Sequence, residues 1–310
     1  MANLPELYIK LVGLVLLGFI LGRILPSIVP LRLGQFLFWF GVPISVVAFL
    51  RKADLSGQIW VAPAVAYVAL FLGVVLAWLA IKCQGYFGKK QKTSLPKSTQ
   101  GSLILTSMVG NTGYLGYPIA LSIVGTEYFA WALFYDLLGS TIGAYGLGVL
   151  IAAWFGEEQK SYWQMAKVIL INPTLWSFGL GLQLRQVHLS SLTILCLDTL
   201  AWTALTAALT LIGMRLSQIQ SWDSLPLAAV SVAVKMIIVP LIISAFLPLL
   251  GITGKTALVI ILQMAMPPAF ASLILAEAFN LDRQLTVSAI ALGSAFILLT
   301  LPVWILITGN

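Results

Sequence analysis

Apolar segments long enough to cross a lipid bilayer follow one another along almost the whole chain. The 310 residues are 60% hydrophobic and only 9% charged, whereas a soluble domain carries about 25% charged residues. A helix needs about 20 mostly apolar residues to span the hydrocarbon core, and helices satisfy their own backbone polar groups there. The sequence therefore predicts an all-α integral membrane protein whose surroundings are a lipid bilayer.

Hydropathy and helix-breaking residues divide the chain into ten predicted transmembrane helices, numbered here as the first to the tenth span. The predicted spans are 7–25, 34–51, 59–81, 100–124, 128–154, 165–183, 190–213, 225–249, 255–278 and 284–308. Because the first apolar run has no basic segment before it and no small-residue cleavage site, it is expected to be a retained helix.

The two halves of the chain share features at matching places. The fifth span contains Leu-Gly-Ser at 138–140 and the tenth contains it at 292–294, while Pro63 and Pro226 open the third and eighth spans. Five spans in each half force the second half to enter the membrane from the opposite side. Residues 1–155 and 165–310 are therefore predicted to be inverted repeats of five helices each.

The distribution of Lys and Arg predicts the orientation. If the connection 82–99 is cytoplasmic, eleven basic residues lie inside and five outside, with Lys235 within the eighth span. The eleven are Arg23, Arg32, Lys82, Lys89, Lys90, Lys92, Lys97, Lys160, Lys167, Arg215 and Arg283. Because cytoplasmic loops are richer in Lys and Arg, we expect a multi-pass inner-membrane protein with both termini outside the cytoplasm. The net charge of +7 then reflects loop anchoring and not binding to nucleic acid.

The fourth span is interrupted by the segment 110–118, GNTGYLGYP. Glycine permits unusual dihedral angles, and Pro118 removes a backbone donor, so the helix is expected to break around Pro118. Asn111, Thr112 and Tyr114 add uncharged hydrogen-bonding groups. Such a break in a membrane is tolerated where it faces protein or a wet cavity, and these four residues are candidates for binding a solute. The alternative is a glycine-rich packing face with one proline kink.

The ninth span carries a second break, 263–269, QMAMPPA. The residue before a proline avoids the helical region, so Pro267 and Pro268 are expected to end the helix, with Gln263 one turn earlier. The half-helix that follows has a positive N-terminus, which suits an anion. Interrupted helices at matching places in two halves indicate a midplane solute site. The alternative is a kink that binds nothing.

Asp136 and Lys235 lie deep within predicted spans, whereas Asp198 and Glu277 lie nearer helix ends and are expected to be structural. A charge at membrane depth costs at least about 2.5–3.5 kcal/mol, so it is usually paired or functional. Lys235 is expected to attract an anionic solute or pair with an acid, or else to reach an interface with its long stem. Asp136 is a candidate for coupling to H⁺, because burial favours the protonated carboxyl group. The alternative for Asp136 is a structural carboxylate held by hydrogen bonds.

Enzyme, metal and cofactor sites are not expected. The chain has no HExxH, no P-loop and a single histidine, His188, in a predicted loop, so no catalytic residue is assigned. Cys83 and Cys196 lack the spacing of metal ligands. These exclusions leave a secondary transporter or a facilitator.

These motifs resemble the auxin efflux carrier family, which includes bacterial permeases and the plant PIN-type carriers. The segment 110–118 is similar to the family's asparagine-threonine to glycine-x-proline crossover, and Lys235 with Pro240 resembles a basic residue and proline in the eighth helix. The second crossover is similar to residues 263–267 and 279–280, and the segment FGVP at 40–43 looks like the family's proline turn in the second helix.

The resemblance implies a fold and a mechanism. The fold would be an inverted five-plus-five bundle with the fourth and ninth helices crossing, related to bile-acid symporters and sodium/proton antiporters. The first, second, sixth and seventh spans would form a scaffold, usually a dimerising one, so a homodimer is expected. The third to fifth and eighth to tenth would form a transport domain with an elevator-like movement. The solute would be a small organic anion, with Asn111, Gln263 and the backbone near Pro118 and Pro267 holding its carboxylate.

The sequence departs from the family's pattern in two places, which limits the properties that can be carried over to this chain. The long cytosolic loop of plant carriers is reduced to about 155–164, which resembles the compact bacterial permeases. The third span contains neither the acid nor the lysine of PIN-type carriers before Lys82, so auxin itself is not assigned as the solute. Two rival functions stay open: a receptor without transport, and a symporter coupled to Na⁺. Neither break contains a carboxylate, which favours H⁺ over Na⁺ for coupling.

Overall fold

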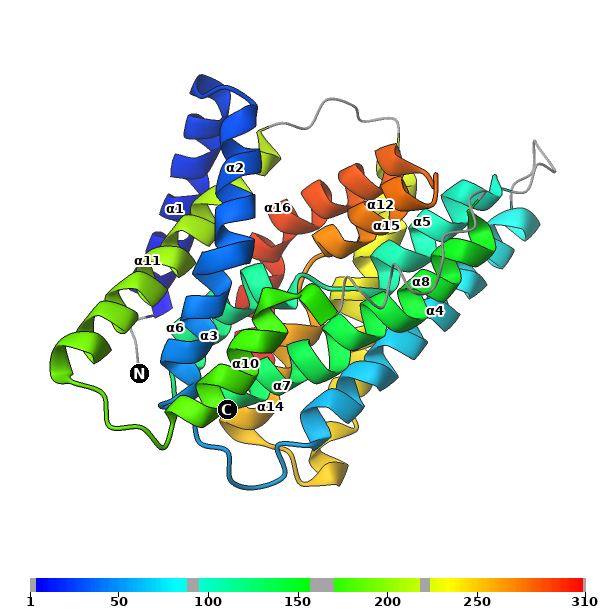
Figure 1. The fold of residues 1–310 in the computed structure, drawn as a ribbon. Coiled ribbons are helices and arrows are strands. Elements are labelled where there is room, and N and C mark those ends of the chain that lie inside the picture. Colours follow the sequence, from blue (N-terminus) through cyan, green and yellow to red (C-terminus); the bar gives the residue numbers. More distant parts are fainter. Residues whose placement is uncertain (1–3, 88–94, 157–169, 218–223, 309–310) are drawn as a thin grey trace.

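A computed structural model describes residues 4–87, 95–156, 170–217 and 224–308, and helices account for nearly all of their regular structure (Figure 1). In these residues, six helices are long and apolar enough to cross a membrane: 28–50, 61–83, 129–155, 191–216, 225–244 and 283–308. Shorter apolar helices cover 12–24, 112–124 and 254–264. The predicted loop residues Lys89, Lys90, Lys92, Lys160 and Lys167 and the start of the sixth predicted span lie outside the described residues.

The first half of the chain follows the predicted spans, with differences at their ends. Its elements are α1 (Leu4–Ile24), α2 (Ile28–Phe36), η1 (Leu37–Gly41), α3 (Val42–Leu50), α4 (Val61–Phe87), α5 (Lys97–Met108), η2 (Thr112–Gly116), α6 (Tyr117–Val124), α7 (Phe129–Phe134), η3 (Tyr135–Thr141) and α8 (Ile142–Phe155). The second span begins at Ile28 and not at residue 34, because Pro30 lies in the first turn of α2, where a missing N–H costs little. The third span extends beyond residue 81 to Phe87.

The second half contains α10 (Pro173–Leu184), α11 (Ser191–Leu216), α12 (Leu225–Ala233), η4 (Val234–Ile238), α13 (Val239–Ser244), η5 (Leu247–Leu250), α14 (Gly254–Met264), α15 (Phe270–Ala278) and α16 (Arg283–Thr308). The side chains of Asn172 and Ser190 cap α10 and α11. The predicted span 225–249 is wrong at its end: the α-helix stops at Ser244, and Pro248 lies in the short 3₁₀ turn η5.

Four of the helices contain a wider π turn. These are η1, η2, η3 and η4, each joined directly to an α-helix in the same span. Two of them carry the candidate ionisable residues, since Asp136 lies in η3 and Lys235 in η4. A π turn inserts an extra residue into the helical repeat and is frequent at functional sites. The buried charges therefore occupy the places where the helices depart from regular geometry.

The described helices form two groups that contact each other. One group consists of α1, α2, α3, α10 and α11, and the other contains α4 to α8 and α12 to α16 (Figure 1). In the first group α1 lies directly against α11, because Gly18 faces the carbonyl oxygen of Thr210 and Gly213 faces that of Val15, with no side chain between the two backbones. Small residues allow this close approach of membrane helices.

Two arginines join the ends of α3 and α10. Arg51 follows α3, and its guanidinium donates to the carbonyls of Leu184 and Val187 at the end of α10. Arg185 follows α10 and donates to the carbonyls of Leu50 and Ala53, at 2.5 and 2.6 Å. Each arginine therefore satisfies the free carbonyls at the end of the other helix.

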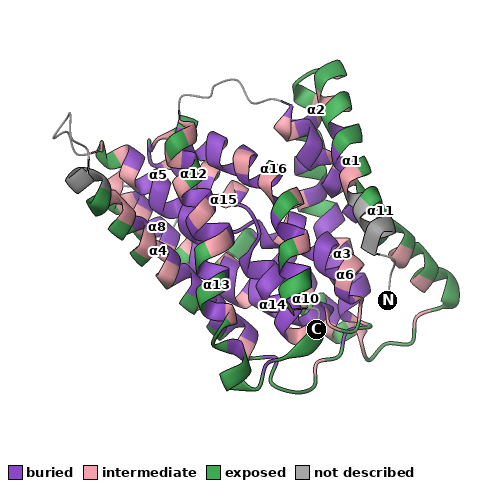
Figure 2. Ribbon diagram, turned by 180° about the vertical axis from the view of Figure 1, so that it is seen from behind, coloured by how far each residue is buried: buried purple, intermediate pink, exposed green. Residues whose placement is uncertain are grey.

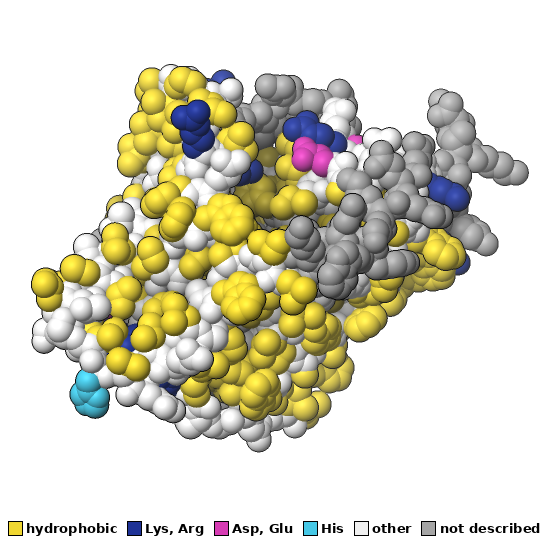
Figure 3. Space-filling model, viewed as in Figure 1, with side chains coloured by type: hydrophobic (Ala, Val, Ile, Leu, Met, Phe, Trp, Pro, Cys, Tyr) yellow, Lys and Arg dark blue, Asp and Glu magenta, His cyan; other side chains and the backbone are white. Residues whose placement is uncertain are grey.

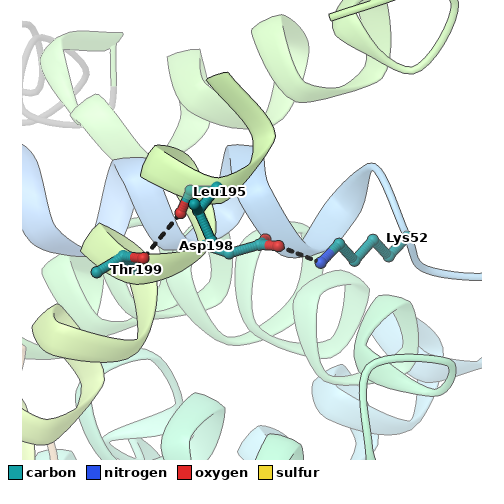
Figure 4. A network of polar contacts seen from close by, with 4 residues as sticks. All are labelled: Lys52, Leu195, Asp198 and Thr199. Carbon is teal, nitrogen blue, oxygen red and sulfur yellow. Dashed lines mark hydrogen bonds and ion pairs between the residues drawn. The ribbon is translucent and has the colours of Figure 1, made fainter. Parts of the chain in front are cut away.

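An ion pair attaches the same end of α3 to α11. Lys52 Nζ lies 2.5 Å from Asp198 Oδ2, and the hydroxyl of Thr199 donates to the carbonyl of Leu195 beside it (Figure 4). Both charged side chains are partly exposed, so the pair contributes little to stability, about 0–1 kcal/mol. The pair gives Asp198 a structural role within the first group of helices.

The outer surface is strongly apolar. Buried residues gather on the inward faces of the helices (Figure 2), and hydrophobic side chains are spread widely over the described part of the face shown in Figure 3. Trp154 and Leu249 are each 79% exposed. Apolar exposure on this scale exceeds that of a soluble monomer and suits a surface in contact with lipid.

Candidate functional site

Both predicted breaks interrupt helices in the structure. α5 ends at Met108, and Val109 has an extended backbone with φ −95° and ψ 120°. α14 ends at Met264, and the chain stays non-helical until Ala269, the extended residue before α15. The second break therefore contains Pro267 and Pro268, as the sequence predicts.

The first break lies at the start of the predicted segment 110–118 and not around Pro118. Pro118 is not in the break, because it occupies the first turn of α6 and follows directly on the π turn η2. A proline is tolerated there, since its missing N–H is not needed at the start of a helix. The helix is interrupted earlier, between Met108 and Thr112, where Gly110 and Asn111 leave the helical conformation.

The two breaks are hydrogen-bonded to each other. Gly110 and Pro268 form an isolated antiparallel bridge, and the N–H of Asn111 donates to the carbonyl of Pro267 at 2.8 Å. Backbone groups released by a break have no water to bond within hydrocarbon. Each break therefore provides the partners that the other one needs, and we call this contact the crossing bridge.

A cavity of about 570 Å³ lies beside the crossing bridge. One side of its wall comes from α2, η1, the start of α10 and the end of α11, and the other from residues 109–114, η3, α8 and α15. The two sides belong to the two groups of helices described above. The cavity is therefore lined by both groups and by one edge of the crossing bridge.

The predicted site residues divide into two sets. Asn111, Thr112, Tyr114 and Asp136 line the cavity. The remaining predicted residues are not among those that line it: Pro118, Lys235, Gln263, Pro267 and Pro268. The structure thus brings together the polar side chains of the first break with Asp136, and it places the second break behind them.

Asp136 holds the segment after the first break. Its carboxylate accepts hydrogen bonds from the hydroxyls of Thr112, Tyr117 (2.6 Å) and Thr141 (3.3 Å). The side chain is only 5% exposed. Three hydroxyl donors satisfy a buried carboxylate, so η3 and η2 are fastened together at the cavity wall.

Lys235 lies on the far side of the crossing bridge. It is 3% exposed, which excludes the predicted alternative of a side chain that reaches the interface. Its Nζ donates to the carbonyl of Met264 at 2.5 Å, at the C-terminal end of α14, where a cation suits the helix dipole. Gly110 leaves room for it, because a Cβ on this glycine would lie 2.9 Å from Lys235 Cε.

Gln263 is fully buried in the last turn of α14, next to the second break. Neither its Oε1 nor its Nε2 has a hydrogen-bond partner. Gly116 of η2 lies directly against this amide, since a Cβ added there would overlap its oxygen. Gln263 therefore lies behind the first break, and its contact is with the backbone of η2.

Arg215 is a cavity residue that the sequence pattern did not identify. It lies in the last turn of α11 and lines the cavity, although its position at the end of a span made it a predicted loop cation. Its guanidinium lies 4.1 Å from the ring centroid of Phe270. A single basic residue at a helix end looks the same in the sequence whether it anchors a loop or faces a cavity, so only its contact with Phe270 and its place in the cavity wall identify it.

The cavity offers hydrogen bonds, one positive charge and two carboxyl groups, those of Asp136 and Glu277. The lining groups include the amides of Asn111 and Asn172, the hydroxyls of Thr112 and Ser140 and the guanidinium of Arg215. Among the described residues, no group of three or more His, Cys, Asp or Glu side chains is placed to hold a metal ion. The arrangement is suited to reversible binding of a small polar molecule.

Comparisons with known proteins agree with this architecture. A family model described as membrane transport protein matches residues 6–305. An uncharacterized transporter of Methanocaldococcus jannaschii is 27% identical over 279 residues, which cover 88% of this chain and 87% of the relative. An uncharacterized transporter of Methanothermobacter thermautotrophicus is 27% identical over 304 residues, 96% of each chain.

Proposed function

Since this chain belongs to the auxin efflux carrier-like family of membrane transport proteins and is a transporter, not an enzyme, we propose that it is a secondary transporter for a small organic anion. The solute class is a carboxylate, either auxin-like or a dicarboxylate. The observation that carries the proposal is the cavity beside the crossing bridge, which is lined by polar groups of the first break and by both groups of helices.

The ends of two half-helices favour an anion in this cavity. Ala269 and Phe270, at the start of α15, line it, and so do Asn111 and Thr112 at the start of η2. Neither start is capped by a side-chain hydrogen bond. The N–H groups of Asn111, Thr112 and Ala269 already donate to the carbonyls of Pro267, Gly110 and Val109, so these helix starts contribute the positive potential of a helix N-terminus, which attracts a negative charge. In the proposal, the carboxylate lies beside these helix starts and accepts a hydrogen bond from the side-chain amide of Asn111.

The position of the cavity supports alternating access. In the proposal, α1, α2, α3, α10 and α11 are the scaffold, and the remaining helices are a transport domain that carries the solute past it in an elevator-like movement. Each group would contain helices from both of the proposed inverted repeats of five spans, 1–155 and 165–310. Movement between them would open the cavity to one side of the membrane and then to the other.

Further parts of the proposal concern the assembly and the coupling ion. We place the protein in the inner membrane, with both termini outside the cytoplasm and two copies joined through their scaffold helices. Asp136 is the proposed H⁺-coupling residue, since its carboxylate lies on the cavity wall and is fastened to Thr112 of the first break. Lys235, Pro118, Gln263, Pro267 and Pro268 would support the site from behind.

Counterflow in liposomes tests the proposal. Purified protein is reconstituted into vesicles loaded with unlabelled malate, benzoate or indole-3-acetate, and entry of the same labelled acid is measured with and without sodium. We expect counterflow of at least one acid without sodium, and none of its neutral amide. Binding without counterflow would favour a receptor, and uptake only with sodium would favour a sodium symporter. If the protein neither bound nor took up any of the acids, the proposal that its solute is an organic anion would be contradicted.

A further inference from the structure

Arg215 is the only Lys or Arg among the described residues that line the cavity. The two acidic residues of the same wall are engaged elsewhere. Asp136 accepts its three hydroxyl hydrogen bonds, and Glu277 Oε1 accepts from Arg283 Nε at 2.7 Å. Among the described contacts, Arg215 therefore has no carboxylate partner and is a positive charge available to the cavity.

Within the part of the chain that the structure describes, no hydrogen bond uses the donors of Arg215. Its Nε is buried and has no hydrogen-bond partner, although a guanidinium carries five N–H donors. Its described contact is with the face of the Phe270 ring. A cation–π contact uses the face of the guanidinium and leaves the donors in its plane free. An unpaired buried donor costs free energy that an incoming acceptor would recover.

The surroundings hold this side chain in position. Gly34 of α2 leaves room for it, because a Cβ on this glycine would lie 2.8 Å from Arg215 Nη2. On the opposite side, Phe270 is in edge contact with Tyr114, whose ring centroid lies 6.5 Å away. Arg215, Phe270 and Tyr114 thus form a continuous contact from α11 to the first break, and the guanidinium is oriented before any solute arrives.

We propose that Arg215 is the charged anchor for the carboxylate of the solute and decides between acids and their neutral analogues. This inference rests on the proposed function and names the residue that gives its site a charge preference. The planar fork of a guanidinium binds both carboxylate oxygens at once. Asn111 then contacts the same solute from the other group of helices.

A second consequence concerns the two faces of the membrane. Arg215 belongs to the proposed scaffold, whereas Asn111 belongs to the proposed transport domain. The solute has both contacts only when the two groups are arranged as in this structure. Loss of Arg215 should therefore raise KM at one face of the membrane and leave KM at the other face nearly unchanged.

Titration of paired ligands tests the role of Arg215. Binding of benzoate, malate and indole-3-acetate to purified protein is compared with binding of benzamide, malamide and indole-3-acetamide. For the acid that the wild type binds, we expect Arg215→Gln to weaken binding by about tenfold or more. Binding of the amide should not change, and Arg215→Lys should fall between the wild type and Arg215→Gln. Arg32→Gln, which removes a charge from the exposed face of α2, is the matched control and should behave as the wild type.

The outcomes separate this inference from the proposed function. An Arg215→Gln variant that binds the acid as tightly as the wild type would overturn the role of Arg215 and leave anion transport standing. Equal weakening for acid and amide would also overturn it, because that result indicates a structural role. A wild type that binds none of the acids would overturn both proposals. Uptake into vesicles of known orientation supplies the second readout, and an equal rise in KM at both faces would contradict the one-sided contact.

Discussion

The two breaks that form the crossing bridge differ in what surrounds them. The first, around Gly110 and Asn111, has polar side chains that line the cavity. The second, around Pro267 and Pro268, is enclosed by protein, with Lys235 and Gln263 on its side and both side chains buried. The first break thus presents polar side chains to the cavity, whereas the two prolines of the second break are buried and only its last residue, Ala269, lines the cavity. A break in a membrane helix therefore marks a place where backbone groups need partners, and only its surroundings decide whether it binds a solute.

The largest expected effect is at the first break, whose polar side chains line the cavity. Asp136→Asn should abolish the pH dependence of uptake and accumulation driven by a pH gradient, because an amide cannot take up and release a proton. Asparagine keeps one acceptor oxygen for the hydroxyls of Thr112 or Tyr117, so the fold should persist. Labelled-acid uptake into liposomes with and without a pH gradient measures this. Asp198→Asn, which removes only a surface ion pair, should retain wild-type coupling. If uptake by Asp136→Asn still depended on the pH gradient, the coupling proton would have to be carried by another group.

The second break, around Pro267 and Pro268, should lose stability when a side chain packed against it is enlarged. A Cβ on Gly293 would lie 2.7 Å from Pro268 Cδ and 2.9 Å from Pro267 Cβ, and these rigid rings cannot move aside easily. We expect Gly293→Ala to lower the free energy of unfolding by about 1–3 kcal/mol, measured by unfolding in detergent. Gly146→Ala is the control, because a Cβ there meets nothing within 4 Å while the gain in helix propensity is the same. Equal stability of the two variants would show that the second break is loosely packed.

A smaller effect is expected from the amide of the first break. Asn111→Ala removes one hydrogen bond to the solute but keeps the backbone N–H that bonds Pro267. We expect KM for the transported acid to rise about tenfold, with the unfolding temperature nearly unchanged. Thr106→Ala, whose hydroxyl bonds only the carbonyls of its own helix, should keep the wild-type KM. An unaltered KM in Asn111→Ala would remove this side chain from the site.

The smallest effect, and one of opposite sign, is expected at Gln263. Both polar atoms of its amide are buried without partners, so Gln263→Leu removes a desolvation cost and should leave stability unchanged or raise it by about 1 kcal/mol. KM should stay at the wild-type value. Gln100→Leu is the contrast, because its Nε2 bonds the carbonyl of Leu95 at 2.7 Å and its loss should lower stability. A rise in KM for Gln263→Leu would contradict this prediction, because it would indicate that Gln263 contacts the solute.

Much of this architecture could be predicted from the sequence, and the exceptions have physical causes. Apolar length located the helices, and the glycine, asparagine and proline residues located the breaks to within a few residues. Pro118 was misplaced because a proline early in a helix and a proline in a break look alike in sequence. The π turns around Asp136 and Lys235 and the cavity position of Arg215 depend on contacts between distant segments, which a local pattern does not contain.

The reciprocal arginine caps have a consequence for how the chain is assembled during synthesis. Arg51 donates to the carbonyl of Leu184, which lies 133 residues later in the chain. Arg185 in turn donates to the carbonyls of Leu50 and Ala53 at the end of α3. While only the first half has emerged from the ribosome, the last carbonyls of α3 lack these guanidinium donors and must be hydrated at the membrane surface. Insertion of α10 closes both ends in one step. The ends of α3 and α10 are therefore completed only after both halves of the chain have been made.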